Sequence, residues 1–280
     1  MSYRMSAQAG GPLRAHFERK VFLAAFSALA MTLAGSITLN GAEDAFDKAE
    51  QAMASKDYAT AINLFQQSLA ADPDSMRNAS ELRQAVLRQT IAGHPKEGAV
   101  ADFDKEIAFF QKLTADHPNS ANAFLNYGFA YVDKIPAAGS ITQVIMANTA
   151  LTQFTKSIDL KPSWIALYTR GNSYLYWPKI FGRAGLGVTD LEKAYTIQKM
   201  EPKKSYHVRV YVSLGDGYWK TENLDKAKSI WKEGLTQFPD SQSLKDRLSK
   251  QGEDLDKYIN DVLDPNKRVD TDLKELWRQP

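Results

Sequence analysis

The chain has 280 residues, of which 44% are apolar and 24% are charged, and its formal net charge is only +2. These proportions are ordinary for a soluble globular protein, and no clustered excess of Lys and Arg predicts a nucleic-acid-binding surface. The chain has no cysteine. Disulfides, thiolate metal sites, a cysteine nucleophile and a lipid anchor on cysteine are therefore excluded.

The first 42 residues differ in composition from the rest. Residues 1–20 hold four basic side chains and one acidic one, and Val21 to Leu39 then run for 19 positions without a charge. A basic start followed by an apolar core predicts a secretory signal peptide, for which Asn40–Ala42 offer a cleavage site. An apolar stretch of this length is also enough to span a bilayer. The alternative is therefore an uncleaved inner-membrane anchor, with membrane contact only through residues 21–39. Both interpretations predict that the remainder is periplasmic or otherwise exported.

A pattern that ends in proline recurs five times between residues 43 and 240, at Pro73, Pro118, Pro162, Pro202 and Pro239. Eight residues before the proline, four copies carry an aromatic residue, such as Phe154 and Trp231. Twelve residues before it, three copies carry alanine, such as Ala227. Residues four apart share a helix face, and proline ends a helix. Each copy therefore predicts a helix that stops at its proline.

The first helix of the repeat is recognisable in two of the copies. One contains Phe124, Tyr127, Gly128 and Tyr131, and the other contains Tyr211, Leu214, Gly215 and Tyr218. The segment from Tyr211 to Pro239 resembles the tetratricopeptide repeat at almost every signature position. The resemblance implies an all-α, right-handed superhelical solenoid of antiparallel helix pairs. In this fold Gly215 and Ala227 are small where two helices approach each other closely, while Tyr218 and Trp231 fill the space between helix pairs.

We expect three regions in chain order: a signal peptide or anchor over 1–42, about five helix pairs over 43–240, and capping helices with a tail over 241–280. Successive prolines lie 45, 44, 40 and 37 residues apart, farther than the family's 34. This spacing predicts inserted loops, including 135–142 and 177–187. A terminal repeat needs a polar outer face, which the charged segment 241–262 supplies. Leu273, Leu276 and Trp277 are predicted to pack back onto the repeats.

The insertion at 177–187 combines Trp177, Phe181, Lys179 and Arg183 with three glycines. Backbone amides and cations in such a loop can converge on an anion or a carboxylate. The alternative is structural, because glycines permit a long turn while the aromatic side chains cover the ends of neighbouring helices. The sequence leaves both interpretations open.

No constellation of catalytic residues stands out in the sequence. The histidines His16, His94, His117 and His207 lie outside HExxH and other metal-binding spacings, and no serine lies in GxSxG. The sequence therefore predicts a protein that is not an enzyme and uses no cofactor or metal.

Tetratricopeptide proteins commonly bind partners on the concave surface formed by the first helices, and the resemblance implies a protein or peptide ligand there. The predicted partner-binding residues, which include those of the 177–187 insertion, are Phe129, Tyr168, Asn172, Tyr176, Trp177, Lys179, Arg183, Arg209, Asp216, Trp219 and Lys220. We expect a scaffold or adaptor in the bacterial cell envelope. The alternative is a small-ligand or glycan-binding accessory subunit of an exported enzyme system. The insertions are expected to decide between the two: if they cover the concave face, a small ligand is favoured, whereas an open groove favours a protein.

Overall fold

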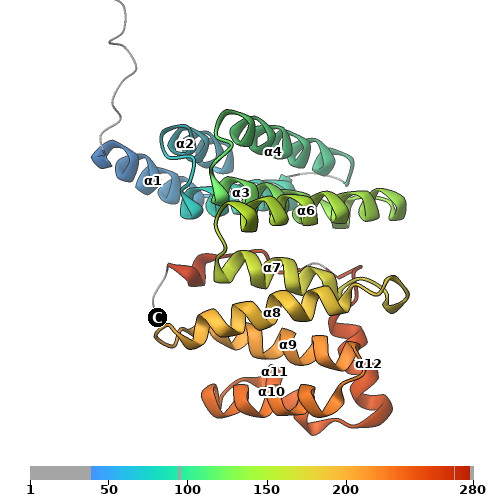
Figure 1. Cartoon of the computed structure of the whole chain (residues 1–280). Coiled ribbons are helices and arrows are strands. Elements are labelled where there is room, and N and C mark those ends of the chain that lie inside the picture. The colour runs from blue at the N-terminus through green and yellow to red at the C-terminus, as the bar shows by residue number, and fades with distance from the viewer. Residues whose placement is uncertain (1–38, 94–95, 268, 278–280) are drawn as a thin grey trace, which may run out of the picture. The chain divides into compact units, whose positions relative to one another are not determined.

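The computed structural model describes residues 39–93, 96–267 and 269–277. The predicted signal peptide or anchor, 1–42, lies almost entirely outside these residues. Every regular element in the described ranges is a helix (Figure 1), which confirms the predicted all-α solenoid. Among those ranges, no helix combines the length and the apolarity needed to cross a bilayer.

The helices follow one another as five pairs and two further helices. The pairs are α1 (Leu39–Ala54) with α2 (Tyr58–Ala71), α3 (Met76–Gly93) with α4 (Lys96–Asp116), α5 (Ala121–Lys134) with α6 (Ser140–Leu160), α7 (Trp164–Leu175) with α8 (Ala184–Lys199), and α9 (Val208–Lys220) with α10 (Leu224–Gln237). They are followed by α11 (Gln242–Ser249) and α12 (Gly252–Val262). Short 3-10 helices are η1 (Ile135–Ala137), η2 (Lys179–Phe181), η3 (Ser205–His207) and η4 (Lys274–Leu276). Each second helix ends just before one of the recurring prolines.

Local sequence explains where several helices begin. The side chains of Asp57, Ser120, Ser163 and Asn223 each accept a hydrogen bond from a backbone N–H in the first turn of the following helix. Such caps satisfy amides that have no partner within the helix. The predicted close approach of helices is also present, since a Cβ at Gly215 would lie 2.1 Å from Nε1 of the buried Trp231.

The apolar interior forms two clusters that meet at α5. One cluster is built from α1 to α5 and contains Phe65, Phe110 and Tyr127. The other extends from α5 to the C-terminal segment and contains Phe129, Phe154 and Trp231. Among the first helices, α3 packs against α5 and α7 against α9, whereas α5 and α7 make little contact. The repeat stack is therefore least tightly closed between its third and fourth helix pairs.

The C-terminal segment, of which the structure describes residues 263–267 and 269–277, returns from α12 to the first helices of earlier repeats. Leu273 is buried in the second cluster, Leu276 and Trp277 pack against it, and η4 contacts η3 just before α9. The end of this segment is the red stretch beside α7 in Figure 1. We call residues 263–277 the C-terminal strap.

Candidate functional site

The first helices and the C-terminal strap enclose a cavity of about 580 Å³. It lies where α5 and α7 separate. Residues of α5 and α6 form one side of the cavity, and residues of α7 and α9 form another. Strap residues, among them Leu263, Val269 and Leu273, form a further side. We call this space the inner cavity. The strap therefore covers part of the inner face, and residues of both inserted loops, such as Pro136 and Phe181, also line the cavity.

Most of the predicted binding residues line this cavity. They are Phe129, Tyr168, Asn172, Tyr176, Trp177, Arg209 and Asp216. Two others, Lys179 and Lys220, line a separate cavity of about 260 Å³ beside α12. Trp219 is buried and donates from Nε1 to Asp256 of α12 at 2.9 Å, so that its indole joins the last repeat to the capping helix.

The aromatic wall of the inner cavity comes from α7. Tyr168 stacks on Trp164 with ring centroids 5.2 Å apart. Burial raises the pKa of Tyr168, and burial raises the pKa of Tyr176 to about 12. Both phenols are therefore neutral at physiological pH.

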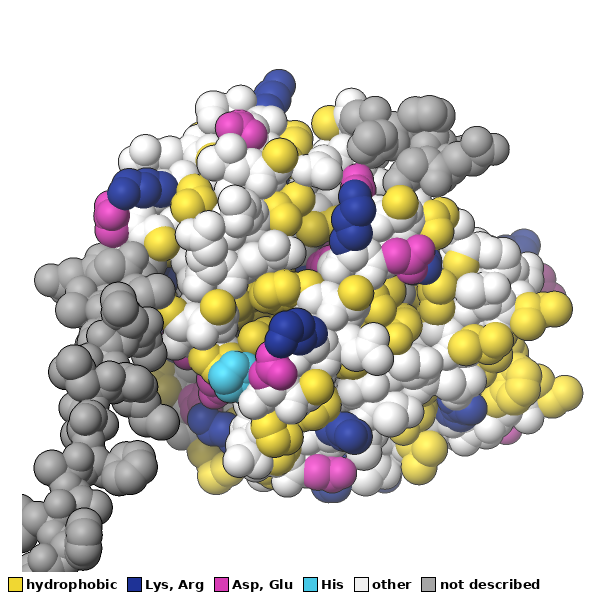
Figure 2. Space-filling model, turned by 90° about the horizontal axis from the view of Figure 1, so that it is seen from above, with side chains coloured by type: hydrophobic (Ala, Val, Ile, Leu, Met, Phe, Trp, Pro, Cys, Tyr) yellow, Lys and Arg dark blue, Asp and Glu magenta, His cyan; other side chains and the backbone are white. Residues whose placement is uncertain are grey.

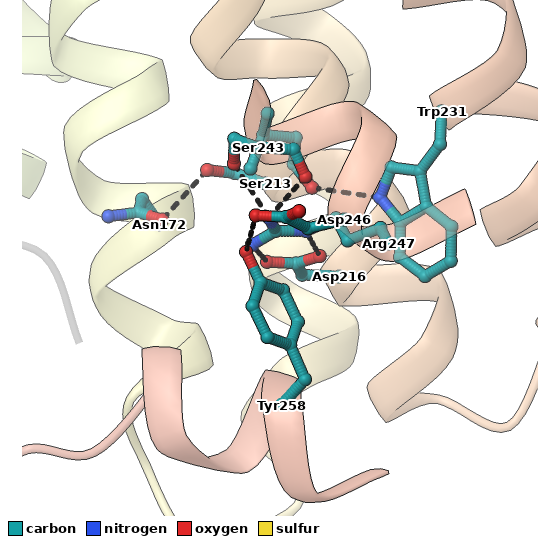
Figure 3. A network of polar contacts seen from close by, with 9 residues as sticks. Asn172, Ser213, Asp216, Trp231, Ser243, Asp246, Arg247 and Tyr258 are labelled. Carbon is teal, nitrogen blue, oxygen red and sulfur yellow. Dashed lines mark hydrogen bonds and ion pairs between the residues drawn. The ribbon is translucent and has the colours of Figure 1, made fainter. Parts of the chain in front are cut away.

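A buried ion pair also belongs to the cavity lining, and the polar network around it is drawn in Figure 3. Arg247 of α11 binds Asp216 of α9 through two hydrogen bonds of 2.6 Å, and both side chains are almost fully buried. Arg247 also donates to the hydroxyl of Ser243 at 2.6 Å. Burial raises the pKa of the Asp216 carboxyl, and the Arg247 charge opposes that shift. The paired geometry satisfies both charges, as burial requires.

A second buried polar network holds the strap on the inner face. Arg83 of α3 donates to Asn126 at 2.9 Å, to Asp133 at 2.8 Å and to the backbone carbonyl of Thr271 at 2.9 Å. The Thr271 hydroxyl donates to the other oxygen of Asp133 at 2.5 Å. Arg83 thus binds the strap backbone and Asp133 binds its threonine hydroxyl, a combination of main-chain and side-chain contacts that also serves in peptide recognition.

Two ion pairs extend this recognition along the strap. Lys274 lies 3.1 Å from the buried carboxylate of Glu81 on α3, and Glu275 pairs with Arg209 of α9. Burial raises the pKa of Glu81, and the positive charge of Lys274 opposes that shift. Neighbouring strap residues therefore bind first helices on both sides of the gap between α5 and α7.

The recognition network was not predicted from the sequence. Arg83, Asn126 and Asp133 were not candidates, and Arg83 is 188 positions from Thr271. Arg83 lies between Glu81 and Gln84 as well as the apolar Leu82 and Val86 of α3, so its sequence context does not distinguish it from an exposed charge. No local signal therefore points to its burial or to its partner.

The insertion at 177–187 packs against α6. Trp177 is buried and meets Phe181 edge-to-face, and Gly182 has the left-handed φ of 63° that ends η2. The Arg183 guanidinium lies 3.6 Å from the centroid of the Trp177 ring and donates to Asn148 at 2.9 Å. These contacts match the structural interpretation of the loop. Binding of an anion by this loop stays a prediction. No group of three or more potential metal ligands gathers anywhere in the described ranges.

No protein-family model matches the chain, and no curated protein matches it. Among solved structures, it is similar to TTC0263, a thermophilic TPR protein of Thermus thermophilus, with a TM-score of 0.51 and 18% identity over 74% of this chain and 97% of the other. A crystal structure of MamA protein gives a TM-score of 0.45 and 17% identity over 75% and 96% of the two chains. The likeness to TTC0263 concerns the fold alone, since fold does not identify a partner.

Proposed function

From the tetratricopeptide-repeat fold of this chain, we propose that it is a non-catalytic scaffold that binds an extended segment of a partner protein on the inner face of its first helices. One observation supports this proposal above the others. The inner face already holds a segment of the chain itself, the strap, through a contact of Arg83 with irregular backbone at Thr271 and through contacts of Glu81 and Arg209 with the 3-10 helix η4.

The strap contacts have the features of peptide recognition. A backbone carbonyl is bound by a buried guanidinium, a hydroxyl is bound by a buried carboxylate, and Leu273 enters the apolar core. Main-chain hydrogen bonds contribute affinity for an extended ligand, and side-chain pockets contribute specificity. A partner segment with a hydroxyl residue, a leucine and alternating charges would meet the same groups, and it would compete with the strap.

The setting that we propose is the bacterial cell envelope, because residues 1–42 have the composition of an export signal or an anchor. Fusion of residues 1–42 to a reporter enzyme that folds only outside the cytoplasm tests this part by itself. Reporter activity supports export, and an inactive, stable fusion contradicts it.

The binding proposal is tested in the native host with a photo-crosslinking amino acid placed at single positions of the full chain. One position is Ile165 on α7, which lines the inner cavity. The control is Thr196, which is exposed on α8. We expect a defined crosslinked protein at Ile165 and not at Thr196. Its yield should rise when the strap is weakened by Thr271→Val together with Lys274→Glu, because partner and strap would compete. Equal crosslinking at both positions, or a yield unaffected by the strap, would count against the proposal.

A further inference from the structure

The inner cavity remains open even with the strap in place. Its volume of about 580 Å³ lies within the range of about 300 to 1,000 Å³ typical of sites for small ligands. Strap residues such as Val269, Thr271 and Leu273 form part of its wall. The cavity is therefore a property of the chain with its strap in place.

The cavity wall is mainly apolar. Its walls include the aromatic rings of Phe129, Trp164 and Trp177 and the aliphatic side chains of Val132 and Leu151. A mostly apolar wall with a few polar groups is the usual composition of a small-molecule site.

The ionised groups of the wall balance and are already paired. The cavity lining contains three basic side chains, Arg209, Arg247 and Lys267, and three acidic ones, Asp216, Asp270 and Glu275. Arg247 pairs with Asp216, Arg209 with Glu275 and Asp270, and Lys267 with Asp261 outside the wall. A charged ligand would lose its hydration without gaining an unpaired counter-charge from these groups, which is costly. The cavity therefore favours an uncharged ligand.

One buried polar group in the wall has no partner. Thr169 of α7 is 6% exposed, and its hydroxyl makes no hydrogen bond within the described part of the chain. Buried hydroxyl groups are normally bonded, and an unpartnered one requires a reason. Rotation of the Thr169 side chain toward the cavity would let a ligand hydroxyl or carbonyl supply that partner.

Exposed apolar side chains surround one end of the cavity. Ile141, Val144 and Ile145 lie on the first turns of α6, with Ile141 81% exposed, and Ile180, Phe181 and Leu186 lie on the adjoining insertion, with Ile180 89% exposed. We call these six residues the apolar rim. Val144 and Phe181 also line the cavity, and the bond from Arg183 to Asn148 joins the insertion to α6. Yellow side chains gather at the right-hand edge of Figure 2. Exposed apolar clusters of this kind mark binding surfaces.

We propose that the inner cavity binds one uncharged amphiphile with a single hydrocarbon chain, such as a long-chain alcohol. The ligand enters across the apolar rim between Val144 and Phe181, and its polar group bonds to the Thr169 hydroxyl. Because strap residues form part of the wall, this site belongs to the chain with its strap in place, and its test needs no partner protein.

The test measures binding of N-phenyl-1-naphthylamine, a neutral fluorescent probe, to the full chain, followed by displacement with 1-dodecanol or dodecanoate. We expect saturable binding of one probe per chain. We also expect displacement by 1-dodecanol at a concentration at least tenfold lower than by dodecanoate, because the carboxylate would be buried without a counter-charge. Equal potency of the two competitors would overturn the uncharged class, and an absence of saturable binding would overturn the site.

Variants locate the site. Ala147→Phe fills the cavity from α6, since Ala147 lines it, and should weaken probe binding at least tenfold. Ala59→Phe makes the same change at an exposed position on α2 and should leave binding unchanged. If Ala147→Phe does not fold, Val144→Asp at the half-exposed rim serves in its place, with exposed Thr152→Asp on the same helix as its control.

Thr169→Val tests the polar contact and should weaken displacement by 1-dodecanol several-fold while leaving binding of the probe unaffected. Binding that is indifferent to Ala147→Phe or Val144→Asp would contradict the assignment.

Discussion

Glu106 is the residue whose surroundings conflict most with its charge. It lies on α4 with both carboxylate oxygens buried and without a hydrogen-bond partner in the described part of the chain. Burial raises the pKa of Glu106 well above its usual value of 4.5, and the negative charge of Asp133 adds to that shift, while Arg83 opposes it. The folded protein therefore keeps a proton on Glu106 that the unfolded chain has already lost.

The pH dependence follows from this difference. Because the pKa of Glu106 is higher in the folded than in the unfolded protein, protonation of Glu106 favours the folded state. This contribution to the free energy of unfolding is fully present below about pH 4.5 and is lost as the pH rises through the folded-state pKa. Glu106→Gln does not titrate. Its advantage in free energy of unfolding over the wild type should therefore be constant below that pH and grow as the pH rises to 7. Urea unfolding at a series of pH values measures it, with exposed Glu253→Gln as control. Parallel curves for Glu106→Gln and wild type would contradict the prediction.

Gly215 gives a second test with a matched control. A Cβ there would lie 2.1 Å from Trp231, whereas a Cβ at Gly185 of α8 would meet nothing within 4 Å. Gly215→Ala should destabilise the protein by about 1–3 kcal/mol, as overpacking does, while Gly185→Ala should be neutral or stabilising by up to about 1 kcal/mol. Thermal melts of the two variants measure the difference. Equal melting temperatures would mean that the helices separate freely at this point.

At the scale of elements, the strap is the feature with the greatest consequence. Thr271 is almost fully buried and bonds to Asp133 by its hydroxyl and to Arg83 by its carbonyl. Thr271→Val removes the hydroxyl and leaves one oxygen of Asp133 without that donor. We expect a loss of about 1–3 kcal/mol, the usual cost of an unsatisfied buried acceptor, with faster amide exchange in residues 269–277. Thr152→Val on the exposed face of α6 should change stability by less than about 0.5 kcal/mol. Unchanged exchange in the strap would show that the network does not hold it.

The sequence predicted the helices and the packing of Leu273, Leu276 and Trp277 onto the repeats, which the structure confirms, but not the polar contacts that hold the strap. Helix ends follow from local signals, namely the recurring prolines and the capping side chains of Ser120 and Ser163. The contact between Arg83 and Thr271 depends on chain return over 188 positions, and no spacing rule encodes it. The repeat register predicted the helical positions of Phe129, Tyr168 and Tyr176, and this is why the sequence indicated them as binding residues. The function of all these residues stays a prediction.

At the scale of the whole described unit, the strap joins the two apolar clusters. It binds α3 and α5 through Arg83 and Asp133, and α9 through Arg209, across the gap where α5 and α7 barely touch. Repeat proteins lose cooperativity when the contacts between neighbouring repeats weaken. The strap should therefore make the two clusters unfold together.

Tryptophan placement makes this cooperativity measurable. All five tryptophans of the chain, Trp164, Trp177, Trp219, Trp231 and Trp277, lie in the second cluster or pack against it, whereas circular dichroism reports every helix. In the wild type the two signals should change together during urea unfolding. In the variant with Thr271→Val and Lys274→Glu they should separate by a resolvable difference in midpoint. Coincident transitions in that variant would show that the clusters are coupled without the strap.

We propose that the inner face recognises a peptide segment with the same kinds of side chains as the strap. Fluorescence anisotropy of a labelled peptide of residues 269–277 tests this most directly. The full chain with Thr271→Val and Lys274→Glu should bind this peptide saturably. The wild type should bind it far more weakly, because its own strap competes at an effective concentration of order millimolar. Adding Arg209→Glu should weaken binding, and a peptide with Glu275→Arg should restore it. Failure of the peptide to bind the weakened-strap protein, or binding that ignores the charge exchange, would contradict the account.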